Sequence, residues 1–168
     1  GASLDASGKR GEYLRKGQRW ERVVQNRKRM QEVCPRVRFR IDAVLSAMNS
    51  LHFPDFHREW LEKGYVGPDG VYLHLLRRPE EYRIQILPKP IKELVFEKYR
   101  RHLEEVVVPG GEMALKVKRH METAMNYMAA RDLSPSLHRF RSATKRLDRL
   151  RGEHFADVFP ELASLMEP

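Results

Sequence analysis

The segment SLDASG (residues 3–8), followed by EYLRKG (residues 12–17), predicts a strand that runs through a glycine turn into a helix. Almost no chain precedes this strand, so its neighbours in a sheet have to come from later residues or from another molecule. An unpaired strand edge is unsatisfied and promotes association. We therefore expect a sequence that begins in the middle of a fold.

Apolar runs and breakers predict that strands and helices alternate after this segment. The run at 37–48 becomes continuously apolar, which is typical of a strand buried on both faces. Helix-length connections favour parallel strands and right-handed crossovers. The predicted fold class is α/β, a partial (β/α) barrel with about three parallel strands. The expected order is strand 2–6, helix 18–33, strand 38–46, helix 54–63, strand 71–76, an extended piece at 82–87 and helix 90–106.

A Pro-Gly-Gly break at 109–111 divides the half-barrel units (residues 1–108) from a helical C-terminal extension (residues 109–168). Helices are expected at 112–130 and from Ser134 to about Leu150, with a short tail after them. Methionines at helical spacing in the first of these helices indicate packing. The extension is expected to pack on the half-barrel and form one structural domain with it.

Composition favours a single globular domain without a membrane segment. The 168 residues are 41% hydrophobic and 33% charged, and no apolar run approaches the roughly 20 residues that cross a bilayer. The N-terminus lacks a secretion pattern, and the single Cys34 excludes an internal disulfide and an all-cysteine metal site. We predict a cytoplasmic protein in which Cys34 is a buried thiol at a helix end.

The net charge of +9 raises the question of nucleic acid as a partner. Acids and bases alternate along the predicted helices, as on a solvated helix face. The densest basic run, Arg27-Lys28-Arg29 with Arg36, Arg38 and Arg40, lacks the aromatic side chains of a stacking platform. Nucleic acid is therefore an open but unfavoured partner.

Four stretches carry a resemblance to a known family. They are SLDASGKRGEYLRKGQRWERVVQNRKRM, LHFPDFHREWLEKG, VYLHLLRRPEEYRIQILPKPIKE and LDRLRGEHFADVFPEL. They are spread over nearly the whole chain, from residue 3 to residue 162, and the chain resembles the C-terminal half of twitch domain-containing radical SAM proteins. The resemblance implies S-adenosylmethionine and a 4Fe–4S cluster as cofactors of the full-length family.

The resemblance also implies four cofactor-binding residues. Ser3 and Asp5 would lie at the carboxyl end of the first strand, where a parallel barrel places its ligands. Arg15 would bind the cofactor carboxylate, and Asn49 would face the same mouth. We expect these side chains to converge on one concave polar site without a metal. The plainer alternatives are turn residues for Ser3 and Asp5, a solvated charge for Arg15 and a loop cap for Asn49.

One departure from the family decides what this chain does alone. The cluster needs three cysteines at CxxxCxxC spacing, and that motif is absent here. The chain is therefore expected to be a fragment or truncated relative, with no catalytic or metal-binding residue of its own. The alternative is an independent basic module that binds an acidic partner or nucleic acid. In either case we expect a homo-oligomer or a missing N-terminal half to cover the sheet edges.

The histidines give no metal motif. His52 and His57 are five residues apart, which does not bring them to one helix face, and Asp55 and Glu59 nearby do not complete a site. The other five histidines are predicted to be isolated surface or core side chains: His74, His102, His120, His138 and His154.

Overall fold

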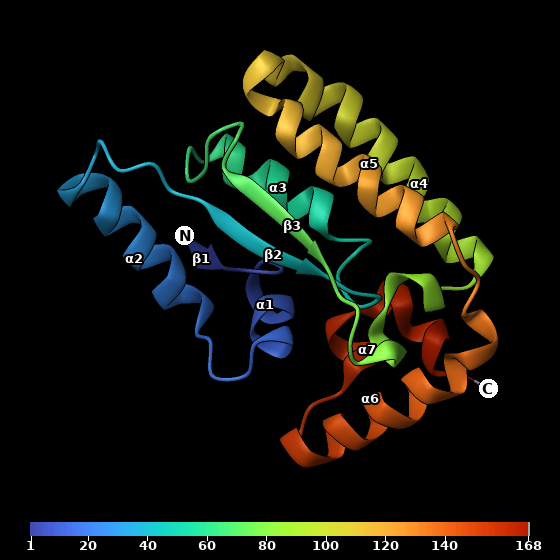
Figure 1. The fold of residues 1–168 in the computed structure, drawn as a ribbon. Helices are drawn as coiled ribbons and strands as arrows, with labels where there is room; N and C mark the ends of the chain where they lie inside the picture. The colour runs from blue at the N-terminus through green and yellow to red at the C-terminus, as the bar shows by residue number, and fades with distance from the viewer. Residues whose placement is uncertain (168) are drawn as a thin grey trace.

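Three short parallel strands form an open sheet in the computed structural model, which describes residues 1–167 (Figure 1). They are β1 (Ala2–Ser3), β2 (Ile41–Leu45) and β3 (Val71–Leu75), in the order β1-β2-β3. The predicted parallel strands are confirmed, but each is shorter than expected. β1 ends early because the Asp5 side chain, rather than a backbone carbonyl, accepts the hydrogen bond from the Val44 N–H.

Helices connect the strands, as the sequence predicts. The chain passes from β1 to β2 through α1 (Gly8–Leu14) and α2 (Trp20–Val33), and from β2 to β3 through α3 (Phe53–Glu62). The remaining elements are the 3₁₀ turns η1 (Glu80–Tyr82) and η2 (Ile84–Ile86), α4 (Lys89–His102), the π-helical turn η3 (Leu103–Val107), the 3₁₀ segment η4 (Val108–Ala114), α5 (Leu115–Ala129), the 3₁₀ turn η5 (Ser134–Ser136), α6 (Leu137–Arg151), α7 (Phe155–Val158) and the 3₁₀ segment η6 (Pro160–Met166).

Two local predictions are wrong. The piece at 82–87 is not extended but forms parts of two 3₁₀ turns. The helix expected at 90–106 is confirmed as α4, which continues as a π-helical turn after His102. Cys34 is exposed rather than buried, because α2 ends there at an outer corner where the flanking Val33 is also 67% exposed. In each case the conformation or exposure depends on tertiary neighbours, which the local sequence pattern does not contain.

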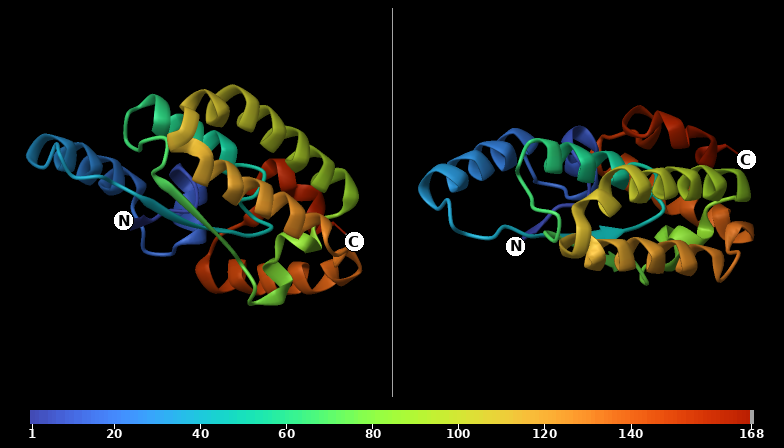
Figure 2. Two further views of the ribbon diagram at one scale, coloured as in Figure 1. Left: turned by 45° about the horizontal axis from the view of Figure 1, so that its top comes forward. Right: turned by 90° about the horizontal axis from the view of Figure 1, so that it is seen from above.

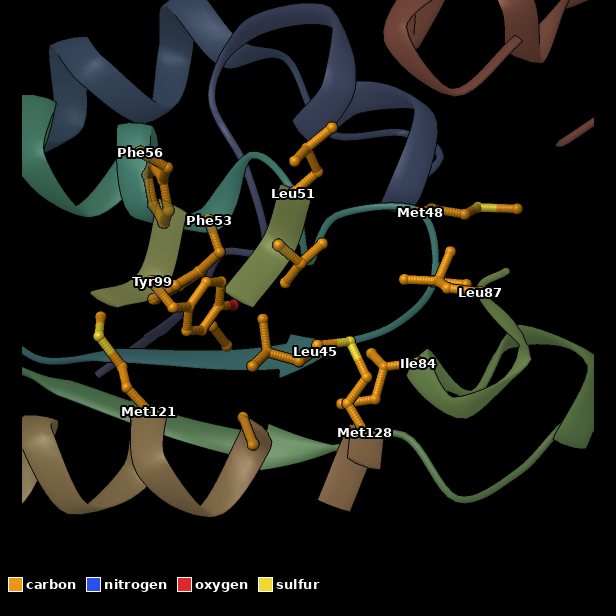
Figure 3. Packing of buried hydrophobic residues seen from close by; sticks show 14 of the residues in the cluster. Leu45, Met48, Leu51, Phe53, Phe56, Ile84, Leu87, Tyr99, Met121 and Met128 are labelled. Atoms are coloured by element: carbon orange, nitrogen blue, oxygen red, sulfur yellow. The ribbon is translucent and has the colours of Figure 1, made fainter. Parts of the chain in front are cut away.

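The hydrophobic core fills the space between one face of the sheet and the helices α3, α4 and α5. Figure 3 shows Leu45 of β2, Phe53 of α3, Tyr99 of α4 and Met121 of α5 meeting there. All four side chains are at most 1% exposed. This packing confirms that the methionines of α5 serve the core.

The other face of the sheet is polar and only partly covered. The parallel register aligns Ser3, Asp42 and Tyr72 across the three strands, with Val44 and His74 in the next row. Ser3 and His74 are exposed and the other three are half-buried. The prediction that β2 is buried on both faces is therefore wrong. Parallel sheets are normally covered on both faces, so this exposure is unusual.

The two edges of the sheet also differ. At the β3 edge, the backbone N–H of Leu73 donates to Nδ1 of His120 from α5, at 3.3 Å. Burial lowers the pKa of His120, which favours the neutral ring that can accept this bond. β1 pairs only with β2 within the described residues. The sheet is therefore capped at β3 and unpaired at β1.

Candidate functional site: the carboxyl-end pocket

A cavity of about 680 Å³ lies beyond the carboxyl ends of the strands, and we call it the carboxyl-end pocket. This is the edge at which open parallel sheets bind ligands, and the volume suits a small molecule. Helix α6 forms its outer wall, along the lower border of the molecule in Figure 1. The pocket is lined by Asp5, Tyr13, Leu14, Arg15, Val44, Ser46, Met48, Leu76, Pro79, Glu81, Tyr82, Ala143, Arg146, Leu147, Leu150 and Arg151.

Asp5 and Arg15 form an ion pair in this pocket. Nε of Arg15 lies 2.7 Å from Oδ2 of Asp5, and Nη2 donates to Oδ1 at 3.1 Å. The pair is built locally: α1 packs so closely on the end of the strand that a Cβ on Gly11 would lie 2.5 Å from the carbonyl oxygen of Ala6. That approach brings the residue after α1 back over Asp5. The two charges cancel each other at the pocket wall.

Asn49 lies beneath the pocket and is fully buried. Its Oδ1 accepts from the backbone N–H of Ser46 at 2.8 Å and from the Ser46 hydroxyl at 3.0 Å. Its Nδ2 donates to the carbonyl oxygens of Asp5 and Val44, each at 3.0 Å. Asn49 therefore joins the ends of β1 and β2 through its side chain and does not line the cavity.

The structure brings three of the four predicted site residues together. Asp5 and Arg15 line the pocket, and Asn49 supports it through the backbone of Asp5. Ser3 does not join them. It lies exposed on β1, on the polar face of the sheet, and is not among the residues that line the cavity.

Sequence reasoning missed the contribution of α6 to this site. Arg146 and Arg151 flank Leu147 and Leu150 on its wall, and Leu150 is 78% exposed. An exposed leucine between two arginines of a predicted helix was the available signal. The left view of Figure 2 shows α6 along the lower border of the molecule, far along the chain from the strands. Only the tertiary fold brings this helix to the pocket at the strand ends.

Two contacts hold α6 against α1. The Tyr13 hydroxyl donates to Oδ1 of Asp148 at 2.6 Å, and Nη1 of Arg151 donates to the Tyr13 carbonyl oxygen at 2.9 Å. Burial, followed by the bond to Asp148, raises the pKa of Tyr13 well above its usual range. The phenol therefore stays protonated and acts as a donor that fixes the wall.

A second group of titratable side chains lies away from the pocket. Nδ1 of His57 on α3 is 2.8 Å from Nε2 of His102 on α4, and both rings are buried. Their outer nitrogens have no hydrogen-bond partner among residues 1–167. Burial lowers the pKa of His57 to about 3 and that of His102 to about 4. The prediction that His102 is isolated is therefore wrong.

Comparison with known protein families, characterised proteins and solved structures found no match to this chain. Within residues 1–167, no three His, Cys, Asp or Glu side chains are grouped in a way that could hold a metal ion. None of the helices in this part of the chain has the length and apolar character needed to span a membrane.

Proposed function

We propose that this chain forms the second half of a barrel enzyme of the radical S-adenosylmethionine class and that the carboxyl-end pocket is one wall of its cofactor site. The position of the Asp5–Arg15 pair carries the proposal. The pair lies at the carboxyl ends of parallel strands, where barrels of this kind place their ligands, and it faces a cavity of about 680 Å³.

The two unusual properties of the sheet support the same function. A polar, partly covered face suits the inner surface of a barrel that other strands complete. The unpaired edge of β1 offers a place where those strands would add. We infer that the complete barrel requires a further polypeptide segment beside β1.

The residues present fit the two cofactors of this class unequally. Arg15 is held at the pocket, yet Asp5 already neutralises its charge, so it offers only part of its donor set to a second carboxylate. No cluster fits, because the one cysteine, Cys34, lies exposed at the end of α2. S-adenosylmethionine supplies radical chemistry only beside such a cluster. The chain alone is therefore inactive.

The role of this chain's residues would be to bind and orient. Asp5 fixes the direction of the Arg15 guanidinium, and Asn49 fixes the strand end that carries Asp5. The apolar side chains Leu147 and Leu150 of α6 would exclude water from the reacting region.

The experiment compares binding of S-adenosylmethionine to this chain alone and to the chain produced together with a CxxxCxxC segment encoded in frame upstream of it. By titration calorimetry we expect no micromolar binding to the chain alone, because one wall is missing. With the added segment we expect binding that Arg15→Ala weakens at least tenfold.

Lys9→Ala is the matched control, because Lys9 is an exposed base on the same helix, α1. It should leave the affinity unchanged. Micromolar binding of S-adenosylmethionine to the chain alone would contradict the proposal, as would the absence of any CxxxCxxC segment that restores binding.

A further inference from the structure

Helix α6 carries more than half of the net positive charge of the protein. Residues 137–151 contain six basic side chains and one acidic side chain, a net charge of +5 out of +9 for the whole chain. The one acid, Asp148, is turned inward, where it accepts hydrogen bonds from the Tyr13 hydroxyl and the backbone N–H of Phe155. Its charge therefore does little to neutralise the outer side of the helix.

The basic run that stands out in the sequence is, by contrast, partly neutralised. Arg27 is buried and donates to the Tyr65 carbonyl oxygen, Arg38 pairs with Asp69, and Arg40 pairs with Asp42. The bases on the outer side of α6 have no acidic partner within 4 Å in residues 1–167. We call them the α6 basic face: Arg139, Lys145, Arg146 and Arg149, all exposed.

The dimensions of this face suit a phosphate backbone. With a rise of about 1.5 Å per residue, Arg139 and Arg149 are separated by about 15 Å along the helix axis. The same length of duplex carries roughly nine phosphate charges. Three of the four bases are arginines, whose planar forks match phosphate oxygens better than a lysine ammonium does.

Two features argue against a lipid surface and against single-stranded nucleic acid as the ligand. The apolar side of α6, with Leu137 and Phe140, is buried in the protein, so the helix cannot insert into a lipid surface. Phe140 is the only aromatic residue of α6 and is fully buried, so the face offers no platform on which single-stranded bases could stack. We propose that the α6 basic face binds the phosphate backbone of double-stranded nucleic acid without regard to sequence.

This surface adjoins the carboxyl-end pocket, because Arg146 belongs to both. A duplex bound along α6 therefore passes over the rim of the pocket. The binding itself depends only on the charges of α6, and it stands or falls separately from the cofactor proposal.

The test measures fluorescence anisotropy of labelled 20-base-pair DNA and RNA duplexes between 50 and 300 mM salt. The variant Arg139→Gln/Lys145→Gln/Arg149→Gln should bind at least 30-fold more weakly at the lowest salt. The slope of log affinity against log salt should become shallower by about 2 to 3, because three phosphate contacts are lost. If the triple variant weakens binding of the DNA and RNA duplexes equally, the ligand is the phosphate backbone that both share. If it weakens binding of only one duplex, that nucleic acid is the ligand.

The matched control is Arg22→Gln/Lys28→Gln/Arg29→Gln, which removes three exposed bases from α2 and the same net charge. It should weaken binding less than threefold, and circular dichroism should show both variants folded. Three results would overturn the proposal: equal weakening by the two triple variants, binding of poly-glutamate as tight as that of the duplexes, or tighter binding to vesicles with 30% phosphatidylserine.

Discussion

Between pH 7 and pH 4.5 the free energy of unfolding of this protein is expected to fall by about 7 kcal/mol. Three buried histidines cause the loss: His52, His57 and His102. Burial lowers their pKa values to about 4, about 3 and about 4. Nearby Arg and Lys side chains add to the shift of His52 and His102, and His102 adds to that of His57. In the unfolded chain each has an ordinary pKa of about 6.5.

The sign follows from proton uptake. Below pH 6.5 these histidines bind protons in the unfolded chain but stay neutral in the folded protein. The free energy of unfolding therefore decreases as the pH is lowered, until the pH reaches the folded pKa values near 3 to 4. At pH 4.5 each such proton costs about 2.5 kcal/mol. One proton on each of the three histidines gives the total, which is comparable to the whole stability of a typical domain.

The charged groups around the His57–His102 pair do not offset this loss. The cations that face His102 are Arg58 and Lys98, and both disfavour a proton there. Arg58 is itself paired with Glu105, and Lys98 is paired with Asp55.

Urea denaturation at pH 7, 6, 5 and 4.5 measures the effect. The double variant His57→Phe/His102→Leu should lose about two thirds of the pH dependence, whatever its stability at pH 7. His154→Gln, which replaces an exposed histidine, should keep the full dependence. Parallel pH profiles for the protein and the double variant would contradict the expectation.

Replacing Asn49 by alanine is expected to lower the free energy of unfolding by about 3 kcal/mol. The fully buried amide makes four hydrogen bonds that join the ends of β1 and β2. Its removal leaves the Ser46 N–H and the carbonyl oxygens of Asp5 and Val44 without these partners. Each buried group left unpaired costs on the order of 1 kcal/mol or more.

The aspartate variant separates the hydrogen bonds from the volume of the side chain. Asn49→Asp keeps an acceptor for Ser46 but directs a carboxylate oxygen at two carbonyl oxygens, so at pH 7 it should destabilise at least as much as alanine. Asn126→Ala, at an exposed position of α5, should change stability by less than about 0.5 kcal/mol. A loss below 1 kcal/mol for Asn49→Ala, measured by urea denaturation, would show that the amide does not hold the strands.

The sequence predicted those parts of the fold that depend on local pattern. Alternating apolar residues and helix-length connections were sufficient to place β2, β3 and the helices between them. The end of β1 could not be predicted, because it is set by a hydrogen bond from Val44 to a side chain 39 residues earlier, Asp5. Exposure of Cys34 depends in the same way on what packs around the end of α2.

In the candidate site, too, contacts between residues near in sequence could be predicted and contacts between distant residues could not. The pairing of Asp5 with Arg15 links residues ten apart, within reach of a strand–turn–helix pattern. The wall supplied by α6 and the pair of His57 with His102 join residues far apart in the chain. No local spacing encodes them. The sequence predicts that Asn49 lies just after the second strand, at the carboxyl end of the sheet. It does not predict that the side chain is buried there, where it bonds to the carbonyl oxygens of Asp5 and Val44.

The bond from Leu73 to His120 limits how copies of this protein can polymerise. Growth of a fibre through strand pairing requires every copy to present two open edges, one for each neighbour. Here the imidazole of His120 already accepts the hydrogen bond from the Leu73 N–H at the β3 edge, so we expect backbone pairing between copies to favour the β1 edge. Pairing through β1 alone stops at two copies, so we expect His120 to oppose fibre growth.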